Sequence, residues 1–175
     1  MNITSKIIIT DTNIITDLDN ANLLEEFIDI DNVYISDMVK NDEINYKTGN
    51  VELINRFKIM SATADQLIEV NRLSYIEKKL STYDLLNFVM ARDNNCILAT
   101  GDNRLKNYSE KNGVEVFRTL KIIRLMKDNN IISCSKAIDA CALLKQCNTT
   151  RIPEENINEL IVELKKEQAQ KVLEQ

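Results

Sequence analysis

Short runs of apolar residues alternate along the chain with longer segments in which apolar residues recur at helical spacing. The first run, residues 6–10, contains three consecutive isoleucines, as expected for a short strand that is buried on both faces. The segment 12–27 predicts one helix or two, with a break near Asp19 and Asn20. The same pattern predicts further strands at residues 33–35, 57–61, 96–99 and 114–117.

Helix-capping signals lie between these strands. Thr63 to Gln66 matches a capping box, and Ser81 to Asp84 carries a second cap signal ahead of an apolar helix. Strands alternating with helices predict a three-layer α/β/α fold with a central parallel sheet of about five strands, plus C-terminal helices. We expect residues 1–130 to form the main domain, and residues 131–175 to form a helical extension packed on it. The helices beyond the last strand are predicted at residues 119–127, 135–145 and 153–173.

Acidic residues fall where the predicted strands and helices meet. Asp11 directly follows the first strand, Asp102 follows the fourth, and Asp84 lies in the opening turn of a helix. Asp42 and Glu43 lie in the opening turns of the helix after the second strand. Because the functional crevice of a parallel sheet lies at the carboxyl ends of its strands, we expect these acids to reach one rim. Each acid alone also fits an ordinary role, as a helix cap or an exposed acid.

The 175 residues contain no histidine, so any catalysis must proceed without imidazole. Carboxylates that converge repel one another unless a cation neutralises them. Oxygen ligands favour hard cations such as Mg²⁺ or Mn²⁺, which stabilise the attacking and leaving oxygens of a phosphodiester. The acid pattern therefore favours metal-dependent phosphodiester hydrolysis.

The charge of the chain does not by itself decide whether the protein binds nucleic acid. The 22 basic and 27 acidic side chains give a net charge of −5, so the protein is not basic overall. A group of basic residues nevertheless follows Asp102, and it represents either a solvated helix face or a rim that guides phosphates. This group comprises Arg104, Lys106, Lys111, Arg118, Lys121 and Arg124.

Cysteine spacing and the N-terminus bear on the compartment. The four cysteines have no C-x-x-C spacing, so we expect free thiols in a reducing cytoplasm. The apolar run near the N-terminus is too short for a signal peptide or a membrane span. The predicted location is cytoplasmic.

The acid-bearing segments resemble the motifs of PIN domains, the fold of many metal-dependent ribonucleases. Residues 9–13 (Ile-Thr-Asp-Thr-Asn) resemble the first motif, residues 80–84 (Leu-Ser-Thr-Tyr-Asp) the third, and residues 97–105 the fourth and most specific. The resemblance covers about residues 6–120. Residues 151–155 (Arg-Ile-Pro-Glu-Glu) resemble the tail of a subgroup with extra C-terminal helices.

The second motif of the family fits this chain in two ways. Spacing from Ser36 and Val39 favours Asp42, whereas the local Glu43-Ile44 pair favours Glu43. Side chains of neighbouring residues point about 100° apart on a helix, so we expect one of the two acids to face the metal.

The resemblance implies an endoribonuclease that hydrolyses RNA with Mg²⁺ or Mn²⁺ as cofactor, in a VapC-like toxin type. It assigns the metal and the catalysis to Asp11, Asp84, Asp102 and either Asp42 or Glu43. Supporting roles are expected for Thr12, Asn13, Thr100 and Asn103, and contacts to RNA phosphate for Arg104 and Lys106. Besides RNA, the expected partners are an antitoxin protein and a second copy in a homodimer, and no membrane is expected.

Two alternatives remain open from the sequence. The first is a catalytically weak PIN-like RNA-binding or regulatory module, motivated by the acidic net charge. The second is a different phosphotransfer protein, either a receiver-like domain or a phosphatase with an aspartyl nucleophile. Such a phosphatase needs a second aspartate two residues after the first, where this chain has Asn13.

Overall fold

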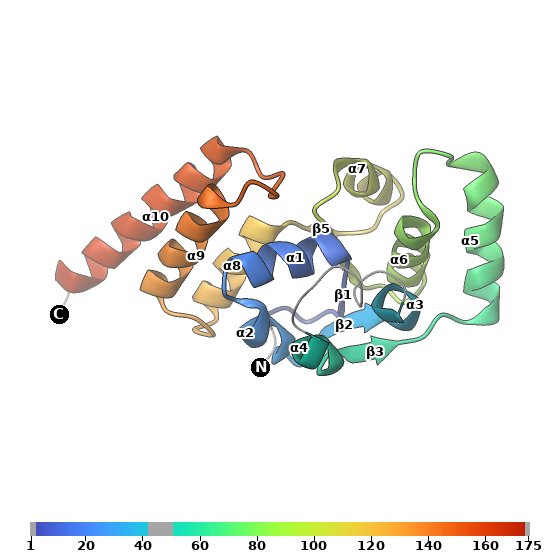
Figure 1. Ribbon diagram of the computed structural model, residues 1–175, viewed down its shortest axis with the longest axis horizontal. Coiled ribbons are helices and arrows are strands. Elements are labelled where there is room, and N and C mark those ends of the chain that lie inside the picture. Colours follow the sequence, from blue (N-terminus) through green and yellow to red (C-terminus); the bar gives the residue numbers. More distant parts are fainter. Residues whose placement is uncertain (1–2, 42–50, 174–175) are drawn as a thin grey trace.

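A five-stranded parallel sheet forms the centre of the fold, between two layers of helices (Figure 1). The computed structural model describes residues 3–41 and 51–173. The strand order is β3-β2-β1-β4-β5, so the chain builds outward from β1 in one direction and then crosses to the other side. The strands are β1 (Ile8–Thr10), β2 (Val33–Ser36), β3 (Lys58–Met60), β4 (Ile97–Ala99) and β5 (Val116–Phe117).

The predicted strands and helices in the described residues are confirmed, with ends that differ by a few residues, whereas Asp42 and Glu43 of the helix expected after the second strand lie outside the described residues. The segment 12–27 forms two helices with a break at residues 21–23, and both predicted caps on the later helices are present. The helices are α1 (Thr12–Asn20), α2 (Leu24–Ile28), α3 (Asp37–Val39), α4 (Val51–Asn55), α5 (Ala64–Ile76), α6 (Thr82–Asp93), α7 (Asn103–Lys111), α8 (Thr119–Asp128), α9 (Cys134–Gln146) and α10 (Glu154–Leu173).

The consecutive isoleucines of β1 point to opposite faces of the sheet, because side chains alternate along a strand. Ile8 packs in a hydrophobic cluster with residues of α1, α2 and α8. Ile9 packs in a second cluster with residues of α6 and with Leu98 of β4. Two buried faces explain why the central strands are apolar without alternation. At the sheet edge, in contrast, Ile59 of β3 is 41% exposed.

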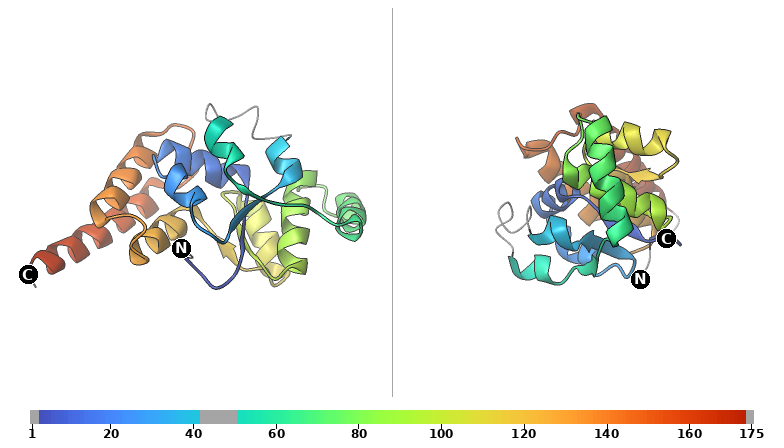
Figure 2. Two further views of the ribbon diagram at one scale, coloured as in Figure 1. Left: turned by 90° about the horizontal axis from the view of Figure 1, so that it is seen from below. Right: turned by 90° about the vertical axis from the view of Figure 1, so that its right-hand side faces the viewer.

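The C-terminal helices share the core of the sheet. α9 packs on α1 and α8, and α10 packs on α9. Buried Leu144 of α9 and Leu164 of α10 belong to the same hydrophobic cluster as Ile8. Figures 1 and 2 show α10 extending to one end of the molecule. One hydrophobic cluster includes buried residues of α8 and α9, on either side of residue 130. The division of the chain at residue 130 remains a prediction.

The four cysteines carry free thiols, as expected. None of the helices in the described ranges is long and apolar enough to cross a membrane.

Candidate active site

Asp11 lies at the point where the strand order reverses. β1 pairs with β2 on one side and with β4 on the other, and ligand sites in open α/β sheets form at such switch points. The backbone N–H of Asp11 donates to the carbonyl of Ala99 at the end of β4, at 2.9 Å. The carboxyl ends of the two central strands are therefore joined at this residue.

The Asp11 carboxylate is oriented by side chains rather than by a helix end. The residue occupies the N-cap position of α1, yet its side chain makes no capping hydrogen bond. Its Oδ2 accepts hydrogen bonds from the Thr100 hydroxyl at 2.8 Å and from the Asn13 amide at 3.1 Å. Asp11 is 4% exposed and Thr100 is fully buried. Since hydrogen bonds to a charged group are the strong ones, this pair fixes the direction of the carboxylate.

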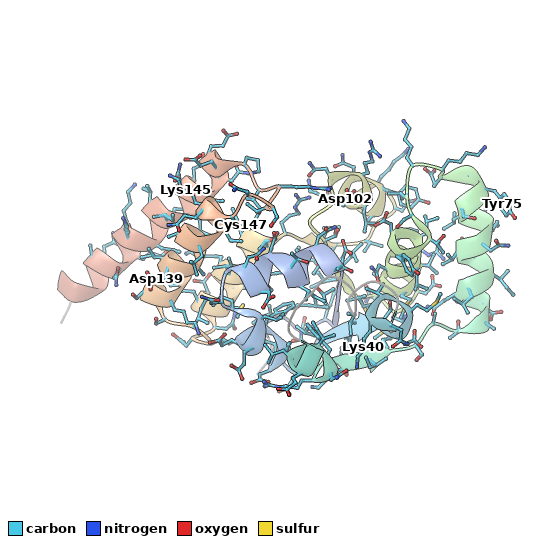
Figure 3. All side chains as sticks on the ribbon, in the orientation of Figure 1. Lys40, Tyr75, Asp102, Asp139, Lys145 and Cys147 are labelled. Carbon is cyan, nitrogen blue, oxygen red and sulfur yellow. The ribbon has the colours of Figure 1, made fainter. Side chains whose placement is uncertain are left out.

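Asp102 is connected to Asp11 through Thr100. The Thr100 oxygen accepts the backbone N–H of Asp102 at 3.1 Å, while its hydroxyl donates to Asp11. The side chain of Asp102 caps α7, because its Oδ1 accepts the backbone N–H groups of Arg104 and Leu105 at 2.7 and 2.8 Å. Figure 3 shows Asp102 beside α7. The capping alternative is thus confirmed for this residue, and it uses one of the two carboxylate oxygens.

Asp84 also takes part in a cap. It is the third residue of α6, and its Oδ2 accepts the backbone N–H of Ser81 at 2.8 Å in a reciprocal capping box. α6 packs against β1 and β4. A helix that leads into a parallel strand runs opposite to it, so the N-terminus of α6 lies at the carboxyl edge of the sheet, as Asp11 does.

The donor chemistry of these acids fits a hard divalent cation, although they are not gathered into a closed cluster. Among the described residues, no three Asp, Glu or Cys side chains lie close enough together to hold a metal ion. The caps use Oδ2 of Asp84 and Oδ1 of Asp102. Among the described residues, the second oxygen of each carboxylate takes no part in these caps. Asp42 and Glu43 lie outside the described residues, so the structure places neither of them.

Gly101 allows the loop after β4 to lie against the start of α1. A Cβ atom on this residue would lie 3.0 Å from Cβ of Asn13, which is tighter than most Cβ contacts and would push Asn13 away by a few tenths of an ångström. Asn13 is one of the two partners of the Asp11 carboxylate. The absence of a side chain at Gly101 therefore keeps Asn13 in position.

Comparison with protein families identifies the fold to which this geometry belongs. A family model described as a PIN domain (DUF3368) matches residues 7–166. The chain belongs to the PIN domain family. No curated protein and no solved structure matches it significantly. PIN domains are generally nucleases that depend on divalent metal ions, so the fold is a nuclease fold.

The residues of the PIN domain for which a supporting role or a phosphate contact is predicted differ in their surroundings. Thr12 is buried, and the Asn103 side-chain oxygen accepts a hydrogen bond from Arg118 at 2.9 Å. Arg104 is exposed on α7 and forms no ion pair with any residue that the structure describes. Lys106 lies 3.4 Å from Glu110, one turn along the same helix.

The group of basic residues after Asp102 does not form one continuous rim. Arg124 is turned towards α10 and makes ion pairs with Asp128, Glu163 and Glu167. Lys121 lies over the Phe117 ring, at 5.6 Å from its centroid. These two residues have structural partners, which removes them from the expected phosphate-guiding surface.

Sequence reasoning missed one buried acid close to this site. Asp17 of α1 is 8% exposed, and its Oδ2 accepts the Thr119 hydroxyl at 2.7 Å. Burial raises the pKa of the Asp17 carboxyl, while hydrogen bonds from Thr119 and Thr150 and the charge of Arg118 act in the opposite direction. A signal was present, because Asp17 follows Ile14 by three residues and so lies on the buried face of its helix.

Proposed function

We propose that this PIN domain is an endoribonuclease that hydrolyses RNA phosphodiesters with Mg²⁺ or Mn²⁺. The observation that carries the proposal is the Asp11 carboxylate, which is buried at the switch point and held by Thr100 and Asn13. A carboxylate with no capping role that is fixed at the crevice of a nuclease fold suits the binding of a catalytic cation.

In this proposal the cation is held by Asp11, Asp84, Asp102 and either Asp42 or Glu43. A bound Mg²⁺ or Mn²⁺ ion supplies charge neutralisation for the phosphodiester and activation of the attacking water. The capping bonds of Asp84 and Asp102 orient those carboxylates by backbone groups, whose positions are set when the helices form. Capping and metal binding are therefore compatible roles for these two residues.

The neighbouring side chains have positioning roles. Thr100 and Asn13 hold the Asp11 carboxylate in one orientation, and Thr100 also fixes the backbone of Asp102. Arg104 lies two residues beyond Asp102 on the exposed start of α7, where its guanidinium is suited to pair with an RNA phosphate. Thr12, Asn103 and Lys106 are proposed to support the same rim.

The test is the loss of one carboxylate charge without loss of the fold. Asp11→Asn should reduce cleavage of a fluorescent RNA at least about a hundredfold in Mg²⁺ or Mn²⁺, because it removes charge from the ion site. The matched control is Asp139→Asn, which removes an exposed acid of α9, far from Asp102 in Figure 3. Circular dichroism should show both variants folded. Cleavage by Asp11→Asn at the parent rate would overturn the proposal.

Two further variants assign the fourth carboxylate. Asp42→Asn and Glu43→Gln are made separately and compared for Mn²⁺ affinity by calorimetry. We expect one of them to weaken binding by tenfold or more and the other to leave it unchanged, since neighbouring helical side chains point in different directions. Equal loss in both variants would contradict a single ligand from this pair.

A catalytically weak RNA-binding module is the second candidate, because Asp84 and Asp102 each have an ordinary capping role. It predicts a protein that binds RNA but takes up no Mn²⁺ in a calorimetric titration. Measurable Mn²⁺ uptake together with RNA cleavage would exclude it.

We also propose a VapC-like toxin role in the cytoplasm, with an antitoxin as protein partner and a homodimer as the assembly. The family membership supports this proposal. Expression of the protein in a bacterial host should arrest growth, and Asp11→Asn should relieve the arrest. Normal growth at full expression of the active protein would contradict the toxin role.

A further inference from the structure

A cavity of about 220 Å³ is lined in part by Asn13 and Gly101, which lie within two residues of Asp11 and Asp102 in the sequence. Its walls come from α1, from the start of α8 and from the connection between α9 and α10, which are distant in the sequence (Figure 1). Apolar and charged groups both line it. The residues that matter here are Asp17, Arg118, Leu120, Arg151, Ile152 and Pro153.

The cavity begins at the residues that hold the carboxylates in place. Asn13 is part of its wall, and the same side chain donates to Oδ2 of Asp11. Gly101 is also part of the wall, and it directly precedes Asp102. A molecule that fills the cavity therefore contacts a hydrogen-bond partner of Asp11 and the residue that precedes Asp102.

The charges of the cavity indicate the chemistry of its ligand. Within the described residues, neither Arg118 nor Arg151 forms an ion pair closer than 4 Å with an acid. Arg118 uses one N–H on the Asn103 side chain, and a guanidinium has five donors. The buried Asp17 carboxylate in the same cavity disfavours a purely anionic ligand such as an acidic peptide. A ligand that matches both the two arginines and the Asp17 carboxylate needs an anionic group and hydrogen-bond donors.

A nucleotide has this combination of groups. Its phosphate pairs with guanidinium groups in bidentate geometry, and its ribose hydroxyls and base N–H groups are donors. Apolar side chains and guanidinium planes also provide surfaces for an unstacked base. A volume of about 220 Å³ is below the range for drug-sized ligands, so the cavity has room for a phosphate and part of its nucleoside but not for a duplex.

We propose that this cavity holds the phosphate and part of the nucleoside of one nucleotide of single-stranded RNA, adjacent to the phosphodiester that is cut. Its phosphate pairs with Arg118 and Arg151, and its base or ribose packs on Leu120, Ile152 and Pro153. The proposal rests on the proposed function, because it names a substrate subsite of that reaction. It assigns to the C-terminal helices a part in substrate binding.

The wall that carries Arg151 is tied to the nuclease fold. The Asn20 amide donates to the Thr149 hydroxyl at 3.4 Å, and Thr150 lies close enough to Asp17 to lower the pKa of its carboxyl. Both contacts join α1 to the connection between α9 and α10. The cavity is consequently preformed, which lowers the entropy cost of binding.

The test measures RNA affinity in protein that cannot cut. The Asp11→Asn protein is titrated into a fluorescein-labelled single-stranded oligoribonucleotide of about twelve nucleotides, and anisotropy is recorded at several salt concentrations. Arg118→Gln and Arg151→Gln should each weaken binding about tenfold and lower the salt slope by about one. The matched control is Lys165→Gln, which removes an exposed charge on α10 and should change affinity less than twofold.

The outcomes of this test distinguish a failure of the cavity proposal from a failure of the hydrolase proposal. Thermal unfolding shows whether each variant is folded, and Arg151→Glu provides a second, charge-reversing change at the exposed position. If the double variant Arg118→Gln/Arg151→Gln binds RNA as tightly as the Lys165→Gln control, the cavity proposal is wrong whether or not the parent protein cuts RNA. If the arginines are required for binding and the parent protein cuts no RNA in Mg²⁺ or Mn²⁺, the cavity is an RNA-binding site, but the hydrolase proposal fails and with it the placement beside a cut phosphodiester.

Discussion

Replacing Thr100 with valine should destabilise the protein, because this one hydroxyl connects the Asp11 carboxylate to the backbone of Asp102. Valine has the shape of threonine, so the fully buried position stays filled and only polar contacts are lost. The first lost contact is the 2.8 Å hydrogen bond to Oδ2 of Asp11, and the second is the 3.1 Å hydrogen bond from the Asp102 N–H.

The magnitude follows from the charge state of the two partners. A hydrogen bond to a charged group contributes about 1.5–3 kcal/mol to stability, and a neutral one about 0.5–1.5 kcal/mol. Together they predict a loss of roughly 2–4 kcal/mol in the free energy of unfolding. For a domain of this size that corresponds to a melting temperature lower by roughly 5–15 °C.

Urea unfolding followed by circular dichroism measures this loss, with Thr10→Val as the matched control. Thr10 is equally buried on the neighbouring strand, but its hydroxyl makes only a 3.4 Å contact to a carbonyl oxygen, so its replacement should cost less. In the Asp11→Asn background, Thr100→Val should cost about 1 kcal/mol less than in the parent, because the acceptor is then neutral. Equal costs for Thr10→Val and Thr100→Val, or no change in the Asp11→Asn background, would refute the reasoning.

Three further predictions test other parts of the structure. Gly101→Ala should displace Asn13 and weaken its hydrogen bond to Asp11, which lowers the rate of RNA cleavage about tenfold and urea stability by roughly 1–3 kcal/mol. Full activity would contradict the close approach. Burial raises the pKa of Asp17 in the folded state, so above pH 3.8 the folded protein binds more protons than the unfolded chain and its stability falls as pH rises. Asp17→Asn removes this loss, so in urea unfolding the variant should gain stability relative to the parent as pH rises from about 4 to about 7. A difference between the two proteins that does not change with pH would refute this. Burial raises the pKa of Cys141 to about 11, whereas a hydrogen bond from a neighbouring threonine lowers the pKa of Cys147, so brief iodoacetamide treatment followed by mass spectrometry should modify Cys147 first and Cys141 only after unfolding.

Much of the fold follows from the sequence because its signals are local. Apolar runs and helical periodicity give the strands and helices, and their alternation gives a parallel sheet with the helices on both faces. The caps at Ser81 and Asp102 were readable as well, since a cap joins residues only two or three positions apart. The position of Asp11 at a strand end also followed, because a strand end is defined by the chain itself.

The tertiary structure alone decided how those residues meet. The Thr100 to Asp11 hydrogen bond joins positions 89 residues apart, and the Thr119 to Asp17 bond joins positions 102 residues apart. Both depend on the strand order that makes β1 and β4 neighbours and on the packing of α8 against α1, which local periodicity does not encode. The same applies to Arg151, which reaches the cavity only because α9 and α10 fold back on the sheet's core. Sequence determined which residues stand at strand and helix ends, and long-range packing determined which of them touch.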